Sequence, residues 1–160
     1  MHDGFPVLLV EDSPDDVWLV KRAFASAGLQ HPLFAVEDGG HAIDYLCGKG
    51  QYADRQAFPL PRLIIADLKM PRVDGFQLIK WMRDDSHARM IPIIVMSSSA
   101  LAEDVNRAYE LGANAYMVKP ANYLALERII TTIARFWDAG LQPHIDGSRA
   151  SFSNCSPSTH

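Results

Sequence analysis

Short apolar runs alternate along this chain with segments whose apolar residues recur three or four positions apart. Five runs of four to six residues carry no polar side chain, which is typical of strands buried on both faces of a parallel sheet. The predicted strands are residues 7–10, 33–36, 63–66, 91–96 and 115–118.

Helical spacing marks the stretches between these runs. Ser13 can cap the first helix, Pro14 suits its first position, and Asp16 completes a pair that resembles a capping box. Glycines such as Gly28 and Gly112 end the helical patterns. The five predicted helices carry their apolar residues within 17–27, 42–47, 76–82, 101–109 and 126–137.

Five strands that alternate with five helices predict βαβ units and therefore a parallel sheet. Right-handed crossovers then favour an α/β, flavodoxin-like doubly wound sheet with strand order 2-1-3-4-5. We expect one domain over residues 1–138, with a long connecting loop at 49–61. Residues 139–160 are weakly apolar and rich in Ser, Pro and Gly, which predicts a flexible tail.

The composition excludes several classes of protein. The net charge of -4 and the pI near 5.8 argue against nucleic-acid binding, which usually needs a basic surface. No apolar run approaches the roughly 18 residues of a membrane span, and the start lacks the basic region of a signal peptide. Cys47 and Cys155 lie far apart and form no disulfide framework, which favours a reducing, cytoplasmic location.

Polar residues follow four of the predicted strands directly. Glu11 and Asp12 end the first strand, Asp67 the third, Ser97 the fourth and Lys119 the fifth. The carboxyl ends of parallel strands share one edge, where open α/β sheets bind ligands. The predicted order makes the first and third strands neighbours, so three carboxylates converge. A hard divalent cation such as Mg²⁺ offsets their repulsion.

The remaining two side chains extend this chemistry. Lys119 brings an ammonium group and Ser97 a hydroxyl to the same edge. A cation, an ammonium and a hydroxyl around one carboxylate suit phosphoryl transfer, in which the phosphoryl oxygens need positive charge and hydrogen bonds. Asp67 is then the nucleophile, and an aspartyl phosphate is the product.

The chain from Phe5 to Trp137 resembles the receiver domain of two-component response regulators. Four pieces carry the resemblance: Leu8 to Asp12, Asp67 to Gly75, Ser97, and Gly112 to Pro120. They occur in the order and at the spacing of that family.

The resemblance implies a phosphoacceptor and its metal. Asp67 accepts a phosphoryl group from a sensor histidine kinase in this family. Asp12, Asp67 and the backbone carbonyl of Lys69 bind Mg²⁺, and Glu11 acts through water. The domain is a signalling domain rather than an enzyme, although it takes part in its own phosphorylation and dephosphorylation.

It also implies a switch. Ser97 and Lys119 contact the phosphoryl group, and Tyr116 moves inward with Ser97 on activation. The bond between Lys119 and Pro120 is expected to be cis, as in a tight turn. We hypothesise that phosphorylation biases the surface of the fourth and fifth helices between two states.

More narrowly, the chain is similar to stand-alone receivers that partner phytochrome-type sensor kinases in bacteria. The features are Glu11 to Asp16, Gly50 to Tyr52, Tyr109 to Asn114, and the closing pair Phe136 and Trp137. No effector domain follows the predicted last helix, so output is expected through protein contacts in a phosphorelay. That closing pair is a candidate surface for a homodimer, or Trp137 packs on its own sheet.

Three alternatives remain. A phosphatase with an aspartyl nucleophile needs a second Asp two positions on as general acid, and Lys69 stands there. A flavin or nucleotide module needs a phosphate-binding loop after the first strand, where residues 11–16 are acidic. A receiver-like scaffold that is never phosphorylated is the third alternative, and the five residues at the strand ends argue against it.

Overall fold

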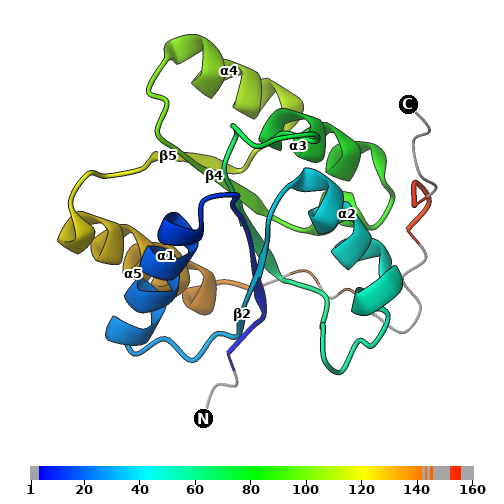
Figure 1. Cartoon of the computed structure of the whole chain (residues 1–160), viewed down its shortest axis with the longest axis horizontal. Helices are drawn as coiled ribbons and strands as arrows, with labels where there is room; N and C mark the ends of the chain where they lie inside the picture. The colour runs from blue at the N-terminus through cyan, green and yellow to red at the C-terminus, as the bar shows by residue number, and fades with distance from the viewer. Residues whose placement is uncertain (1–3, 142, 144, 146–151, 156–160) are drawn as a thin grey trace.

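The computed structural model describes residues 4–141, 143, 145 and 152–155. Its core is one parallel sheet of five strands in the order β2-β1-β3-β4-β5 (Figure 1), which confirms the predicted fold. The strands are β1 (Val7–Val10), β2 (Leu33–Val36), β3 (Leu63–Ala66), β4 (Ile93–Ser97) and β5 (Ala115–Val118).

The three central strands are buried along their whole length, while the edge strands β2 and β5 are partly exposed. This explains why unbroken apolar runs predicted the central strands. β4 begins two residues later than predicted. Pro92 has no amide hydrogen for the ladder, although its carbonyl still accepts a hydrogen bond from the Ile64 amide at 2.9 Å.

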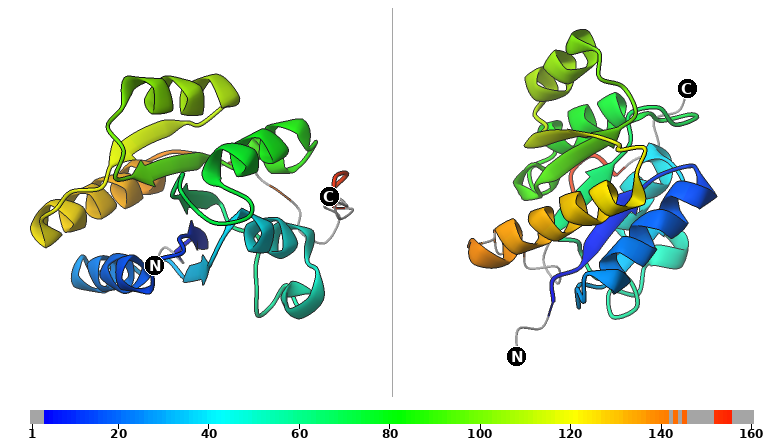
Figure 2. Two further views of the ribbon diagram at one scale, coloured as in Figure 1. Left: turned by 45° about the horizontal axis from the view of Figure 1, so that its top comes forward. Right: turned by 90° about the vertical axis from the view of Figure 1, so that its left-hand side faces the viewer.

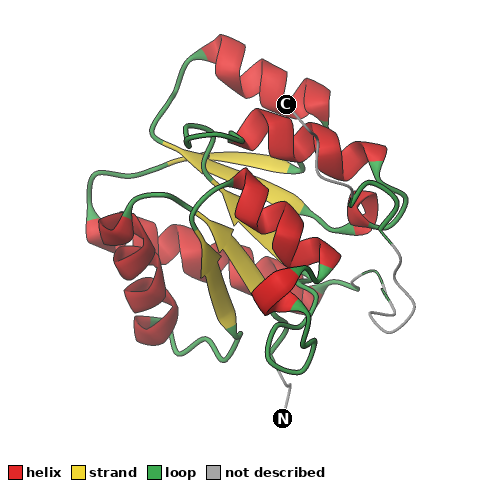
Figure 3. Ribbon diagram, turned by 45° about the vertical axis from the view of Figure 1, so that its right-hand side comes forward, coloured by secondary structure: helices red, strands yellow, loops and turns green. Residues whose placement is uncertain are grey.

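Helices cover both faces of the sheet, with α1 and α5 side by side on one face and α2, α3 and α4 on the other (Figures 2 and 3). Two apolar clusters result, because successive strand residues point to opposite faces: Leu8 and Val10 join one cluster, and Val7 and Leu9 the other. The helices are α1 (Pro14–Ser26), α2 (Gly39–Cys47), α3 (Gly75–Asp84), α4 (Ala102–Leu111) and α5 (Tyr123–Ala139), with single 3₁₀ turns at Gly50–Tyr52 and Ala88–Met90.

The predicted loop 49–61 contains the first of these 3₁₀ turns and packs closely on α2. Arg55 donates hydrogen bonds to the carbonyls of Tyr45 (2.8 Å) and Leu46 (2.6 Å), which lie in the last turn of the helix. The Tyr45 hydroxyl in turn donates to the Pro59 carbonyl at 2.9 Å. The loop thus supplies hydrogen-bond donors to carbonyls at the end of α2, where the helix itself offers few.

The prediction that the two cysteines stay unpaired is wrong. Cys47, the last residue of α2, forms a disulfide with Cys155, which lies 108 positions further on. Separation in sequence did not reveal this pair, because the chain returns after α5 and places residues 152–155 beside α2 and α3 (red in Figure 1). The predicted flexible tail, 139–160, falls largely outside the described residues.

Within the described part of the chain, no helix is both long and apolar enough to cross a membrane.

Candidate functional site

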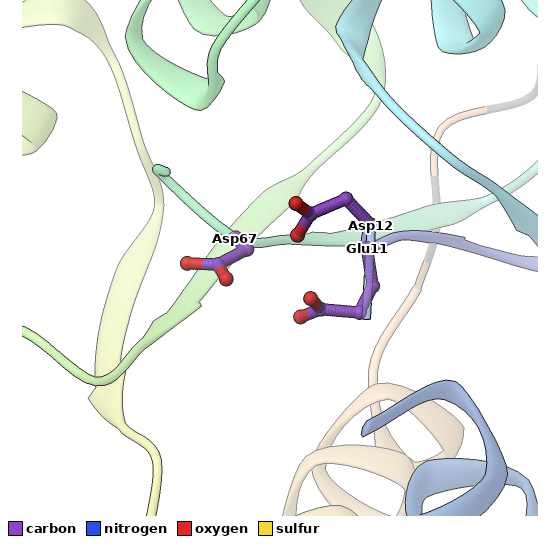
Figure 4. A group of neighbouring side chains, drawn as sticks. All are labelled: Glu11, Asp12 and Asp67. Atoms are coloured by element: carbon purple, nitrogen blue, oxygen red, sulfur yellow. The ribbon is translucent and has the colours of Figure 1, made fainter. Parts of the chain in front are cut away.

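The predicted carboxylates meet at the carboxyl edge of the sheet. β1 and β3 pair in parallel, with Val10 opposite Ala66, so the residues that follow them in each strand lie side by side. Carboxylate oxygens of Glu11, Asp12 and Asp67 all lie within 4.8 Å of one another, and the three groups point to the same side (Figure 4). Glu11 and Asp67 are buried, and Asp12 is exposed.

Asp67 is held by its own loop. Its Oδ1 accepts hydrogen bonds from the backbone amides of Leu68 (2.7 Å) and Lys69 (3.5 Å). Gly75 opens α3 against this loop, and a Cβ atom there would lie 2.2 Å from the Asp67 carbonyl oxygen. Only glycine allows α3 to start so close to the acid, and the Gly75 amide donates to the Leu68 carbonyl at 2.9 Å.

Lys119 reaches back across the sheet edge to three carboxylates. Its Nζ donates to Glu11 Oε2 at 2.6 Å, Asp16 Oδ2 at 3.0 Å and Asp67 Oδ2 at 3.0 Å. Burial alone would lower the pKa of Lys119, but these hydrogen bonds outweigh burial and raise it, so the ammonium stays charged. The bond from Lys119 to Pro120 is trans, so the predicted cis bond is wrong. Trans is the intrinsic preference of such bonds, by roughly 0.5–1 kcal/mol.

The site carries more negative than positive charge. Burial raises the pKa of Glu11 to about 7, although the hydrogen bond from Lys119 acts in the opposite direction. Lys119 pairs with the carboxylates of Glu11, Asp16 and Asp67, and the carboxylate of Asp12 lies close to those of Glu11 and Asp67. Oxygen donors with excess negative charge fit a hard divalent cation. The assignment of Asp12, Asp67, the Lys69 carbonyl and a water-mediated Glu11 as the metal ligands stays a prediction.

Asp16 is a member of this site that the sequence analysis missed. It was interpreted as a helix-start residue, and its amide does donate to the Ser13 hydroxyl at 3.3 Å. Its carboxylate, however, contacts Lys119 from the first turn of α1. The available signal was its place one turn after Glu11 and Asp12, but capping acids occur at the same place.

Ser97 and Tyr116, the two predicted switch residues, both contact Ser99 in the loop after β4. Ser97 is fully buried, and its Oγ accepts a hydrogen bond from the Ser99 amide at 3.2 Å. The Tyr116 hydroxyl donates to the Ser99 carbonyl at 2.7 Å. The loop therefore links the end of β4 to β5.

The sequence analysis also missed a pair of residues, Asp38 and Arg72, which holds the loop between Asp67 and Gly75. Arg72 has a φ of 64° and donates from Nε to Asp38 Oδ2 at 2.9 Å, with a second bond from its Nη2. Burial would raise the pKa of Asp38, but hydrogen bonds from His41 and Arg72 outweigh it and lower that pKa. The pair ties the acid-bearing loop to the start of α2, which Asp38 caps.

Comparison with known proteins identifies the family of the chain. The family model for the response regulator receiver domain matches residues 7–131. The chain belongs to this family.

The relatives of this receiver include phytochrome response regulators. It is 33% identical over 131 residues to the response regulator Rcp1 of Synechocystis sp., covering 82% of this chain and 87% of that protein. It matches the crystal structure of the phosphorylated cyanobacterial phytochrome response regulator RcpA with a TM-score of 0.81 at 32% identity, over 88% of this chain and 99% of that one. The crystal structure of the response regulator RPA3017 in red light signaling of R. palustris matches with a TM-score of 0.83 at 35% identity, over 88% of this chain and 99% of that one. The predicted resemblance is thus confirmed.

Proposed function

We propose that this receiver accepts a phosphoryl group on Asp67 from a sensor histidine kinase and passes the signal on by protein–protein contacts in a phosphorelay. The observation that carries the proposal is the contact between the buried Asp67 carboxylate and the Lys119 ammonium, 3.0 Å apart, beside two further acids. This set suits a nucleophile whose product must be stabilised by positive charge.

The proposed transfer begins with Asp67 as the nucleophile. The backbone amides of Leu68 and Lys69 hold Oδ1, which leaves Oδ2 to attack phosphorus. The new P–O bond forms as the P–N bond of the kinase phosphohistidine breaks, and the imidazole leaves. Lys119 then shifts its hydrogen bond from Oδ2 to a phosphoryl oxygen, and the Ser97 hydroxyl donates to another.

Asp12, Asp67 and the Lys69 carbonyl would hold Mg²⁺, with Glu11 acting through water. When bound, the cation would offset the negative charge of the acids and of the incoming phosphoryl group. The excess of carboxylates over ammonium groups supports this proposal. So does a similar protein, the response regulator Rcp1, whose Mn²⁺-bound form has been solved; the match has a TM-score of 0.78 at 31% identity and covers 88% of this chain and 99% of that one.

The proposed kinase is of the phytochrome type. The support is the likeness to the cyanobacterial phytochrome response regulator RcpA and to RPA3017, a response regulator in red light signaling. The decisive experiment for this finer statement is transfer of labelled phosphate from a purified phytochrome-type kinase. Label on wild type but not on Asp67→Asn supports it, and transfer from unrelated kinases alone contradicts it.

A homodimer through the last helices is a second proposed contact. Trp137 packs against the protein's own core, whereas Phe136 is 70% exposed beside an apolar groove of about 240 Å³. Sedimentation equilibrium should then give a dimer for wild type and a monomer for Phe136→Ser. Exposed Leu124, in the first turn of α5, offers a control in Leu124→Ser. A monomeric wild type at all concentrations and phosphorylation states contradicts the dimer.

The experiment that tests the acceptor is intact-mass analysis after incubation with acetyl phosphate and Mg²⁺. Wild type should gain one phosphoryl group, about 80 Da, and Asp67→Asn should gain none. A chelator should abolish the gain. Absence of any gain with both acetyl phosphate and phosphorylated kinases would instead favour a scaffold that is never phosphorylated.

A further inference from the structure

Residues 152–155 form a small patch on the α2–α3 face that the proposed phosphotransfer does not use. Phe152 is buried, and its ring meets that of His87 edge to face at a centroid distance of 5.8 Å. The carbonyl of Asn154 accepts a hydrogen bond from the Trp81 indole Nε1 at 3.0 Å. Residues 152–155 are therefore held by the ring contact of Phe152 with His87 and by the hydrogen bond from Trp81 of α3.

Asp85, at the end of α3, supplies the other anchor. Its fully buried carboxylate accepts hydrogen bonds from the amides of His87 (2.8 Å) and Ala88 (2.9 Å) on its own turn. It also accepts from the Ser153 hydroxyl and the Asn154 amide, both at 3.2 Å. Half of the donors to a buried charge therefore come from this segment, and removing them leaves that charge less well paired.

The covalent bond between Cys47 and Cys155 closes the segment onto α2. Both cysteines are partly exposed and partly packed against the core, and exchange requires a thiolate to reach one of the two sulfur atoms. Without the bond, residues 152–155 lose their covalent link to α2 and are held at α3 by the hydrogen bonds and the ring contact described above. Their effective concentration at α3 is then much lower, and their contacts become a reversible equilibrium.

We propose that the Cys47–Cys155 pair is a thiol–disulfide exchange site that controls the attachment of residues 152–155 to the α2–α3 face. The partner is a protein or small molecule with a reactive dithiol. Its first thiolate attacks one sulfur, which forms a mixed disulfide and releases the other cysteine as a thiolate. Its second thiolate then displaces the remaining cysteine. Two electrons and two protons pass to the receiver, and the dithiol becomes a disulfide.

Reduction of the disulfide would change a cleft of about 470 Å³, which lies between residues 152–155 and the loop that follows Asp67. Asn154 and Trp81 line one part of it, and Arg72 and Val73, which belong to the loop between Asp67 and Gly75, line another. Detaching the segment removes part of the wall that faces that loop.

The first test is thiol labelling of the full chain in buffers of defined dithiol-to-disulfide ratio, followed by denaturation and intact-mass analysis. The proposal predicts a two-state titration: no maleimide adduct when oxidised and two when reduced, without mixed or intermolecular products. Two adducts at every ratio, or disulfide-linked dimers in place of the internal bond, would overturn it.

The second test asks whether the pair controls attachment. The ¹H–¹⁵N signal of the Trp81 indole, which donates to Asn154, should shift on reduction, and Cys155→Ser should show the reduced position under all conditions. Trp18, whose side chain is exposed on α1, is the internal control. Phe152→Ala keeps the disulfide intact, so it separates the effect of Phe152 packing on the Trp81 signal from the effect of the disulfide. A Trp81 signal that is the same in Cys155→Ser and oxidised wild type overturns the proposal. Neither test requires phosphorylation, so failure here is distinct from failure of the proposed function.

Discussion

The buried carboxyl of Glu11 makes cation binding at the sheet edge depend on pH. Burial raises its pKa from the ordinary 4.5 to about 7, and a protonated Glu11 takes one negative charge out of the site. The apparent affinity for Mg²⁺ should therefore fall as the pH drops from 8 to 6, by up to about tenfold per unit below the pKa if the proton must leave. Glu11→Gln should flatten the profile. An affinity for wild type that stays constant across this range contradicts the account.

The same shift has the opposite sign for the stability of the metal-free protein. A carboxyl whose pKa is higher in the folded state favours folding below its ordinary pKa. This contribution is lost as the pH rises from about 4.5 through about 7. Added divalent cation offsets the loss, because it binds the ionised form.

Asp16 competes with the proposed phosphoryl group for Lys119, because its carboxylate already accepts a hydrogen bond from that ammonium. Asp16→Asn should therefore speed phosphorylation by acetyl phosphate. Partly exposed ion pairs contribute about 0.2–1 kcal/mol, which corresponds to roughly 1.5- to 5-fold in rate. Asp15→Asn is the matched control, since Asp15 lies on the same helical turn but is not one of the three partners of Lys119. Equal rates for the two variants would count against this role.

At the scale of elements, Tyr116 on β5 is the proposed connection between Asp67 and the α4–α5 surface. Its hydroxyl holds the Ser99 carbonyl in the loop that leads into α4. Phosphorylation of wild type should change amide exchange in residues 98–104. In Tyr116→Ala this change should be lost. Tyr116→Phe keeps the ring and removes the hydroxyl, so it separates the contributions of these two groups to the change in exchange. A phosphorylation-dependent change of equal size in wild type and Tyr116→Ala would show that the switch runs elsewhere.

The elements themselves were largely predictable, because strands buried on both faces must be apolar throughout and their carboxyl ends must share an edge. That is why the sequence alone predicted that Glu11, Asp12, Asp67 and Lys119 lie at one edge of the sheet. Features that depend on tertiary contact were not predictable in the same way. Asp16 looked like a capping residue, and nothing local marked the partner of Arg72 in Asp38.

At the scale of the whole molecule, the chain couples its last described residues to its first half. The disulfide from Cys47 to Cys155 spans most of the sequence. The residues around each cysteine show no local pattern that would predict the pairing. The phosphoacceptor edge and the disulfide lie on different parts of the domain, and the loop after Asp67 faces both the site and the cleft beside Asn154. The receiver thus has two chemically independent inputs in this account.

The most direct test of the central claim locates the phosphoryl group itself. After incubation with acetyl phosphate and Mg²⁺, borohydride reduces an acyl phosphate to an alcohol, so the modified residue can be found by tandem mass spectrometry of peptides. Reduction is expected at Asp67 alone, dependent on Mg²⁺ and blocked by a chelator. Reduction at Asp12 or at another acid, with Asp67 unchanged, would contradict it.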